Sequence, residues 1–89
     1  MQTTDIVISN KLGLHARAAA KLTQLAGKFQ SEVFISRDGQ RVNAKSIMGV
    51  MMLAAGKGVT VTIDAEGADA QAALEAIKDL FDDKFGEGE

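Results

Sequence analysis

Residues 59–64 read V-T-V-T-I-D, and this alternation of apolar and polar side chains is the clearest secondary-structure signal in the chain. Successive side chains of a β-strand point to opposite faces, so Val59, Val61 and Ile63 share one face and the polar residues share the other. One buried face and one face in water are typical of an antiparallel sheet that is covered on one side. The stretch therefore predicts a fold built on a sheet with one open face.

Three more strands and three helices are predicted around this strand. Alternating apolar residues and a strong Asp-Gly turn signal predict strands, in chain order, at residues 5–9, 31–37 and 40–43. Strong helix formers with apolar residues at helical spacing predict helices at residues 16–28, 47–53 and 70–84. Ser46 and Asp69 are the expected N-caps of the second and third helices, and the tail from Gly86 to Glu89 is expected to be frayed.

The order strand, helix, strand, strand, helix, strand, helix (βαββαβα) predicts an α+β fold. Strands with one wet face suit an open-faced β-sandwich, in which a four-stranded, mostly antiparallel sheet carries three helices on one face. A chain of 89 residues is short for more than one domain, so residues 1–89 are expected to form a single domain.

The composition argues against several classes of function. The chain has no cysteine and a single histidine, so we expect no metal site and no cofactor. A net charge of −2 and an aromatic content of 4% argue against nucleic-acid binding, which needs a concentrated basic face. The longest apolar stretch, residues 47–55, is far shorter than the roughly 20 residues that span a bilayer. We therefore expect a cytoplasmic protein without membrane contact.

The single histidine, His15, lies between a glycine turn at Gly13 and the start of the first predicted helix. A helix N-terminus has unpaired N–H groups and a partial positive charge, both of which favour phosphate binding. Arg17 adds a planar guanidinium for an oxyanion, and a neutral imidazole is nucleophilic near neutral pH. The pattern fits a residue that accepts and passes on phosphate, and it also fits a surface histidine beside a helix start. The local chemistry leaves both interpretations open.

Two separated motifs distinguish these interpretations. Gly13-Leu14-His15-Ala16-Arg17, followed by an alanine-rich helix, resembles the active-site signature of the histidine-containing phosphocarrier protein (HPr) family of the bacterial phosphoenolpyruvate-dependent phosphotransferase system. Lys45-Ser46-Ile47-Met48-Gly49, leading into residues 51–53, resembles the second signature of that family. Element order and chain length also match, so the resemblance covers nearly the whole chain.

The resemblance implies a phosphoryl carrier and not an enzyme with a substrate of its own. His15 would accept a phosphoryl group from phospho-enzyme I on its Nδ1 atom and donate it to a histidine of enzyme IIA domains in sugar transport. Arg17 and the backbone N–H groups of Ala16 and Arg17 would stabilise the phosphate. The family usually has proline after the arginine, whereas this chain has Ala18. Proline fixes φ in the first helical turn, so we expect a slightly less rigid but working site.

The second motif implies regulation and docking. In some family members the serine that matches Ser46 is phosphorylated by a dedicated HPr kinase/phosphorylase, and Ser46 is also an ordinary N-cap. The short second helix cannot bury every side of so apolar a run, and methionine adapts to several partner shapes. The predicted docking surface comprises Leu14, Ala20, Ile47, Met48 and Met51. We expect the carrier to be a monomer.

Two alternatives remain open. The nitrogen-related branch of the same system uses a very similar carrier with a regulatory output, and the motif at residues 10–17 suits either branch. A small ligand-binding or metal-delivering domain could have a similar fold, although this chain lacks the paired Cys or His ligands that such a role normally needs.

Overall fold

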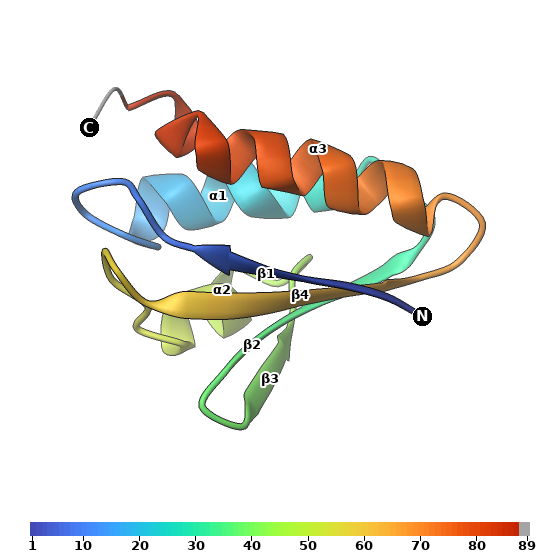
Figure 1. Cartoon of the computed structure of the whole chain (residues 1–89), viewed down its shortest axis with the longest axis horizontal. Helices are drawn as coiled ribbons and strands as arrows, with labels where there is room; N and C mark the ends of the chain where they lie inside the picture. The colour runs from blue at the N-terminus through green and yellow to red at the C-terminus, as the bar shows by residue number, and fades with distance from the viewer. Residues whose placement is uncertain (88–89) are drawn as a thin grey trace.

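The computed structural model describes residues 1–87 of the chain. Within these residues the chain forms four strands: β1 (Gln2–Val7), β2 (Glu32–Arg37), β3 (Gln40–Asn43) and β4 (Thr60–Glu66). Three α-helices, α1 (Ala16–Ala26), α2 (Ile47–Met52) and α3 (Ala70–Asp82), alternate with them, and a 3-10 turn, η1 (Lys84–Gly86), follows α3. The predicted βαββαβα order is confirmed (Figure 1).

The strands form one sheet in the order β1-β4-β2-β3, and every neighbouring pair is antiparallel. The alternating stretch at residues 59–64 thus lies mostly in β4, between β1 and β2. In the register of the sheet, Val61 pairs with Ile6 and Ile63 pairs with Ile35. Cross-strand pairing places these apolar side chains on one face, and all four are buried.

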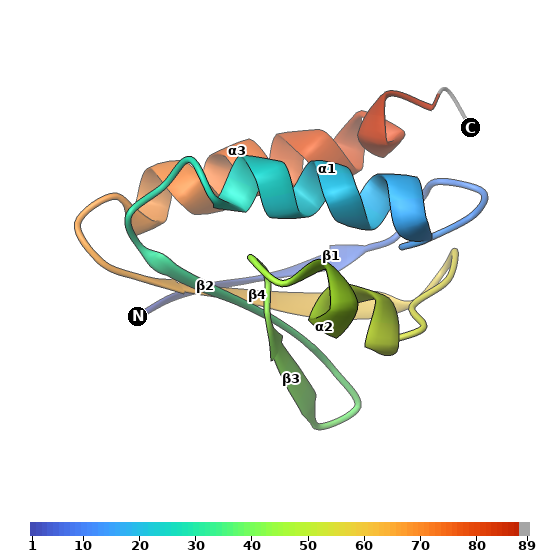
Figure 2. The same ribbon diagram turned by 180° about the vertical axis from the view of Figure 1, so that it is seen from behind.

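The helices cover that apolar face. Helices α1 and α3 lie side by side over the sheet, and α2 packs against α1 and β3 (Figures 1 and 2). The buried core joins strand residues to the inner faces of the helices, including Leu22 and Ala26 of α1 and Ile77 and Phe81 of α3. The opposite face of the sheet is open and mostly polar. There Thr3 donates a 2.8 Å hydrogen bond to Asp64. No helix within residues 1–87 combines the length and apolar character needed to cross a membrane.

Several strands and helices begin or end at residues other than those predicted. Strand β1 begins at Gln2 and not at residue 5, because its polar first residues pair with β4, as in the match of Gln2 with Ala65. Helix α1 ends at Ala26, short of residue 28, and α3 ends at Asp82, short of residue 84. The chain after α3 tightens into η1, and this turn has positive φ angles that an α-helix excludes.

The position of Asp69 is as predicted, but its side chain has a different role. It is the N-cap residue of α3, but within the described residues its side chain makes no capping hydrogen bond. Instead its carboxylate accepts 2.8 Å hydrogen bonds from the backbone N–H groups of Gln30 and Ser31, and one from the Ser31 hydroxyl. The Ser31 side-chain bond, with the backbone bonds, lowers the pKa of Asp69. Asp69 therefore ties the start of α3 to the chain entering β2.

Candidate functional site

The turn between β1 and α1 is fixed by backbone contacts. Gly13 has a φ of +64°, and a Cβ atom there would lie 2.5 Å from the carbonyl oxygen of Ala55. Asn10 is fully buried and its side chain donates a 2.8 Å hydrogen bond to the Gly13 carbonyl. The Leu14 N–H donates a 2.9 Å bond to Ala55. Only glycine allows this close approach, and the turn places His15 in a fixed position at the start of α1.

His15 is the N-cap residue of α1 and has an extended backbone. Its carbonyl accepts the first helical hydrogen bond from the Ala19 N–H at 2.8 Å. Within residues 1–87 its side chain makes no capping hydrogen bond, and the imidazole is 26% exposed. Residues 16–19, the first turn of the helix, contain no acidic side chain. The N-terminal N–H groups and their partial positive charge thus lie beside a solvent-accessible imidazole.

An open pocket of about 550 Å³ adjoins this imidazole. Its lining consists of basic and apolar side chains from the turn and α1, with one acidic residue from the C-terminal segment: Lys11, Leu12, His15, Ala16, Arg17 and Glu87. The structure therefore brings together His15, Ala16 and Arg17, as the sequence predicts. A pocket with two basic side chains and a helix N-terminus is suited to an anion held against the imidazole.

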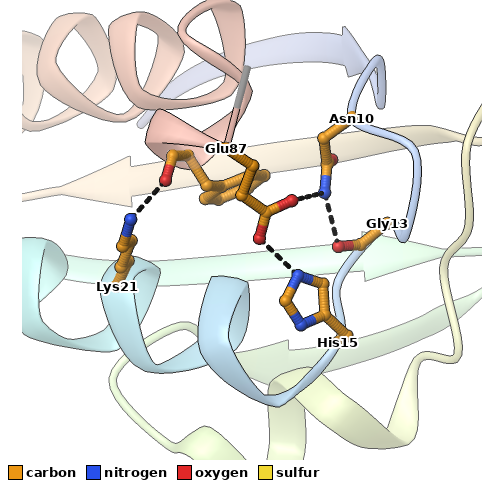
Figure 3. A network of polar contacts seen from close by, with 6 residues as sticks. Asn10, Gly13, His15, Lys21 and Glu87 are labelled. Atoms are coloured by element: carbon orange, nitrogen blue, oxygen red, sulfur yellow. Dashed lines mark hydrogen bonds and ion pairs between the residues drawn. The ribbon is translucent and has the colours of Figure 1, made fainter. Parts of the chain in front are cut away.

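Glu87 is the site residue that sequence reasoning missed. One carboxylate oxygen pairs with Nε2 of His15, and the other accepts a 3.1 Å hydrogen bond from the Asn10 amide (Figure 3). Burial of the carboxylate favours its neutral form. The hydrogen bonds from Asn10 and His15, together with the charge of Arg17, outweigh burial and lower the pKa of Glu87.

The expectation of a frayed tail is consequently wrong for Gly86 and Glu87, while residues 88 and 89 lie outside the described part of the chain. Gly86 belongs to η1, and Glu87 is mostly buried, with its side chain 12% exposed. A tail of glycine and glutamate has the composition of a disordered end, and no local pattern indicates a contact 72 residues away.

Comparison with known proteins decides the family. A family profile described as "PTS HPr component phosphorylation site" matches residues 2–83. The chain belongs to the HPr family. It is 62% identical to the phosphocarrier protein HPr of Cupriavidus necator, with both chains covered in full. It also matches the crystal structure of HPr-C-His from Thermoanaerobacter tengcongensis with a TM-score of 0.95, 48% identity and 98% of each chain covered. The chain is therefore a phosphocarrier of the phosphotransferase system, with the HPr fold.

Two further matches concern the branch and the assembly. The phosphocarrier protein NPr of Shewanella violacea is 49% identical over 93% of this chain and 91% of that protein. The crystal structure of an HPr dimer from T. tengcongensis matches with a TM-score of 0.79 and 48% identity, covering 98% of this chain and all of that one. Among residues 1–87 no three His, Cys, Asp or Glu side chains are grouped so as to hold a metal ion.

The second HPr signature begins α2. The Ser46 hydroxyl accepts a 3.2 Å hydrogen bond from the Gly49 N–H, which confirms its prediction as an N-cap, and the residue is exposed. Ala18, the departure from the usual HPr proline, is fully buried on the core-facing side of the first turn of α1.

The predicted docking residues differ in how far they are exposed to solvent. Ile47, Met48 and Met51 are 39%, 70% and 41% exposed, while Leu53 and Val50 are buried. Ala20 is half-buried. Leu14 is only 5% exposed and packs into the core, so its assignment to the docking surface is corrected: it is a core residue.

The structure adds two exposed apolar residues that the docking prediction omitted. Leu12 and Met52 are 65% and 67% exposed. Leu12 lies in the turn before α1 and also lines the pocket beside His15, and Met52 is the last residue of α2. The exposed apolar surface thus includes residues of both the turn and α2.

Proposed function

We propose that His15 is the phosphoryl-carrying residue, which accepts phosphate from phospho-enzyme I and donates it to a histidine of enzyme IIA domains in sugar transport. The observation that carries this proposal is the position of the imidazole: it is solvent-accessible, at the N-terminus of α1, in one pocket with Arg17. Such a site presents a nucleophilic nitrogen beside groups that bind phosphate oxygens.

In the transfer, the lone pair of a ring nitrogen of His15 attacks phosphorus. The new N–P bond forms as the N–P bond of the donor histidine breaks, and the bonding electron pair returns to the donor ring. Arg17 and the backbone N–H groups of Ala16 and Arg17 stabilise the negative charge of the phosphoryl oxygens. The onward transfer reverses these roles, so His15 ends each cycle unchanged and the protein acts as a carrier.

Phosphate uptake tests the role of His15. Purified protein incubated with phosphoenolpyruvate and enzyme I should gain one acid-labile, base-stable phosphate, and His15→Ala should gain none. Arg41→Ala, an exposed change on the open face of the sheet, is the matched control and should be labelled normally. Labelling of His15→Ala through the same route would refute the proposal.

We propose that the exposed residues of α2, Ile47, Met48 and Met51, contact enzyme I and the enzyme IIA domains. Helix α2 packs against the N-terminal half of α1, whose first residues flank His15 (Figure 2). An adaptable methionine surface suits a carrier that binds a donor and several acceptors in turn.

Ser46 offers a route of regulation by an HPr kinase/phosphorylase in a host that has one. Its exposed hydroxyl stands at the start of α2, directly before the docking residues. A phosphate there would add about −2 charge to the partner-binding face, which would weaken docking while the helix N-terminus tolerates the anion. Treatment with such a kinase and ATP should label the wild type and leave Ser46→Ala unlabelled.

A second candidate function is the nitrogen-related regulatory branch, which the similarity to the NPr of S. violacea favours. A panel of purified enzyme IIA domains from both branches distinguishes the two functions. Rapid transfer to sugar-specific acceptors supports the first proposal, and transfer to the nitrogen-related acceptor alone supports the second.

A further inference from the structure

The structure assigns a positioning role to Glu87: we propose that its carboxylate holds the proton of His15 on Nε2 and thereby presents Nδ1 as the nitrogen that takes the phosphoryl group. This inference rests on the proposed function of His15 and extends the site to the C-terminal segment of the chain. The contact comes from a side chain 72 residues away in sequence (Figure 3).

The segment that carries Glu87 is anchored in the fold. Phe85 is fully buried and packs edge-on against Phe81, with 4.7 Å between the ring centroids. Lys21 of α1 donates a hydrogen bond to the Phe85 carbonyl. Positive φ angles at Phe85 and Gly86, of 56° and 74°, turn the chain within η1 just before Glu87. The contacts of η1 with the rest of the fold therefore hold Glu87 beside His15.

The hydrogen-bond chemistry of the contact determines the tautomer. An ionised carboxylate only accepts hydrogen bonds, so a neutral His15 ring must carry its proton on Nε2 to donate to Glu87. A neutral imidazole has one N–H and one lone pair, and the lone pair is then on Nδ1. The second oxygen of Glu87 is held by Asn10, which is itself buried and anchored to the Gly13 carbonyl. The lowered pKa of Glu87 keeps the acceptor ionised near neutral pH.

The same carboxylate stabilises the charge that transfer creates. As the Nδ1 lone pair forms the N–P bond, the ring retains its Nε2 proton and becomes a cation, while the donor ring recovers the electron pair of its broken bond. The negative charge of Glu87 at Nε2 favours that cation, as a carboxylate does when it orients a catalytic imidazole. No proton has to leave the ring of His15 during the step.

Charge alone would predict the opposite effect of Glu87. A carboxylate in the pocket repels an incoming phosphoryl group, and in that case Glu87 would restrain phosphorylation. The pairing geometry favours positioning, because Glu87 binds Nε2 and leaves the other ring nitrogen for attack. The two roles predict rate changes of opposite sign when the carboxylate is removed.

Nitrogen NMR of the His15 ring tests the inference without any phosphotransfer. In alkaline solution, where imidazole is neutral, the wild type should show the Nε2–H tautomer and a slowly exchanging Nε2–H proton. In Glu87→Ala this proton signal should disappear, and the ratio of the Nε2–H to the Nδ1–H tautomer should fall about tenfold, since a hydrogen bond to a charged group is lost. Glu87→Gln, which keeps an acceptor oxygen without the charge, should lie between them.

The control variant is Asp82→Asn, which removes one negative charge from an exposed position near the end of α3 and should leave the ring signals unchanged. Amide spectra that match the wild type establish that each variant is folded. With enzyme I and phosphoenolpyruvate, Glu87→Ala should be phosphorylated about tenfold more slowly than Asp82→Asn.

Unchanged tautomer and proton signals in Glu87→Ala, or faster phosphorylation of that variant, would overturn the inference. A wild type that shows the predicted tautomer but takes no phosphate would instead refute the proposed function of His15 and leave the contact with Glu87 established.

Discussion

Arg17 lies two residues after His15 and lines the same pocket, where its guanidinium can make two hydrogen bonds to a phosphoryl group. Arg17→Ala should therefore slow phosphoryl transfer from enzyme I by about tenfold to a hundredfold, as expected when a charged hydrogen-bond donor to the transferred group is lost. Arg17→Lys should recover only part of the rate, because an ammonium lacks the planar fork of donors. Initial rates measured beside Arg41→Ala test this; equal rates for Arg17→Ala and Arg41→Ala would contradict it.

The backbone conformation and close packing of Gly13 contribute to stability, and a second glycine with positive φ serves as the comparison. Gly13→Ala would have a strained positive φ and a Cβ atom 2.5 Å from a backbone oxygen, so we expect a loss of about 2–5 kcal/mol in the free energy of unfolding. Gly39 also has a positive φ, of 81°, but open space around it, so Gly39→Ala should lose only about 1 kcal/mol. Urea denaturation measures both, and equal losses would show that the close approach at Gly13 carries no cost.

At this scale the sequence indicates only those site residues that lie close together along the chain. His15, Arg17 and the helix start lie within one motif, and the structure brings them into one pocket. Glu87 depends on the burial of Phe85 and on the Lys21 contact, and both are tertiary. For Leu14 the sequence misleads in the opposite way. It lies within the motif and is therefore predicted to be a surface residue, yet its side chain is buried in the core.

At the scale of elements, the carboxylate of Asp69 joins the start of α3 to the chain before β2. Because hydrogen bonds lower the pKa of Asp69 in the folded state, its contribution to stability is complete above the ordinary aspartate pKa of about 3.9 and disappears as pH falls through the lower folded value. Asp69→Asn should be less stable than the wild type at pH 7, and the difference should narrow as pH falls from about 5 toward 2.

Chemical denaturation across this pH range provides the measurement, with the exposed Asp79→Asn as control. Asp79→Asn should follow the wild type at every pH. A difference between wild type and Asp69→Asn that is independent of pH would show that the ionised carboxylate is not what joins the two elements.

The sequence predicts the bounds of strands and helices correctly where the local pattern is strong. Residues 40–43 form β3 as predicted, because the Asp-Gly turn fixes where the hairpin restarts, with Asp38 and Gly39 both at positive φ. The sequence predicts too late a start for β1, since the polar first residues of this strand become extended only by pairing with β4. Which strands pair depends on residues that are distant in the sequence, so a short stretch of sequence does not reveal it.

For the whole molecule, the open polar face of the sheet and the exposed apolar surface at α2 have different roles, and only the second is proposed to bind partners. Met48→Lys should change the free energy of unfolding by less than about 0.5 kcal/mol, since the side chain is 70% exposed. It should raise the KM for phosphorylation by enzyme I about five- to tenfold, as the loss of roughly 1 kcal/mol at an interface implies. Steady-state kinetics with enzyme I measure the effect.

Val7→Lys is the matched control, because Val7 is 59% exposed and lies in β1, outside the docking surface. It should leave the KM unchanged. Equal effects of the two substitutions would mean that α2 does not dock enzyme I.

The overall architecture follows from the sequence because amphipathic strands and helices have few ways to bury their apolar faces together. Ile6, Val61 and Ile63 specify one buried sheet face, and α1 and α3 each have one apolar face to cover it. The order of the strands in the sheet could be read only from the structure, since it depends on which strand edges pair.

The oligomeric state is a further property of the whole molecule, and we propose a monomer. Sedimentation at micromolar concentration should give a mass near 9.4 kDa. Twice that mass would indicate a dimer like that of T. tengcongensis.

The phosphorylated atom is the most direct test of the site. After incubation of ¹⁵N-histidine-labelled protein with enzyme I and phosphoenolpyruvate, ³¹P NMR should show one phosphoramidate resonance coupled to Nδ1 of His15. A resonance without coupling to His15, or no protein-bound phosphate at all, would contradict the role of His15 as the phosphoryl carrier.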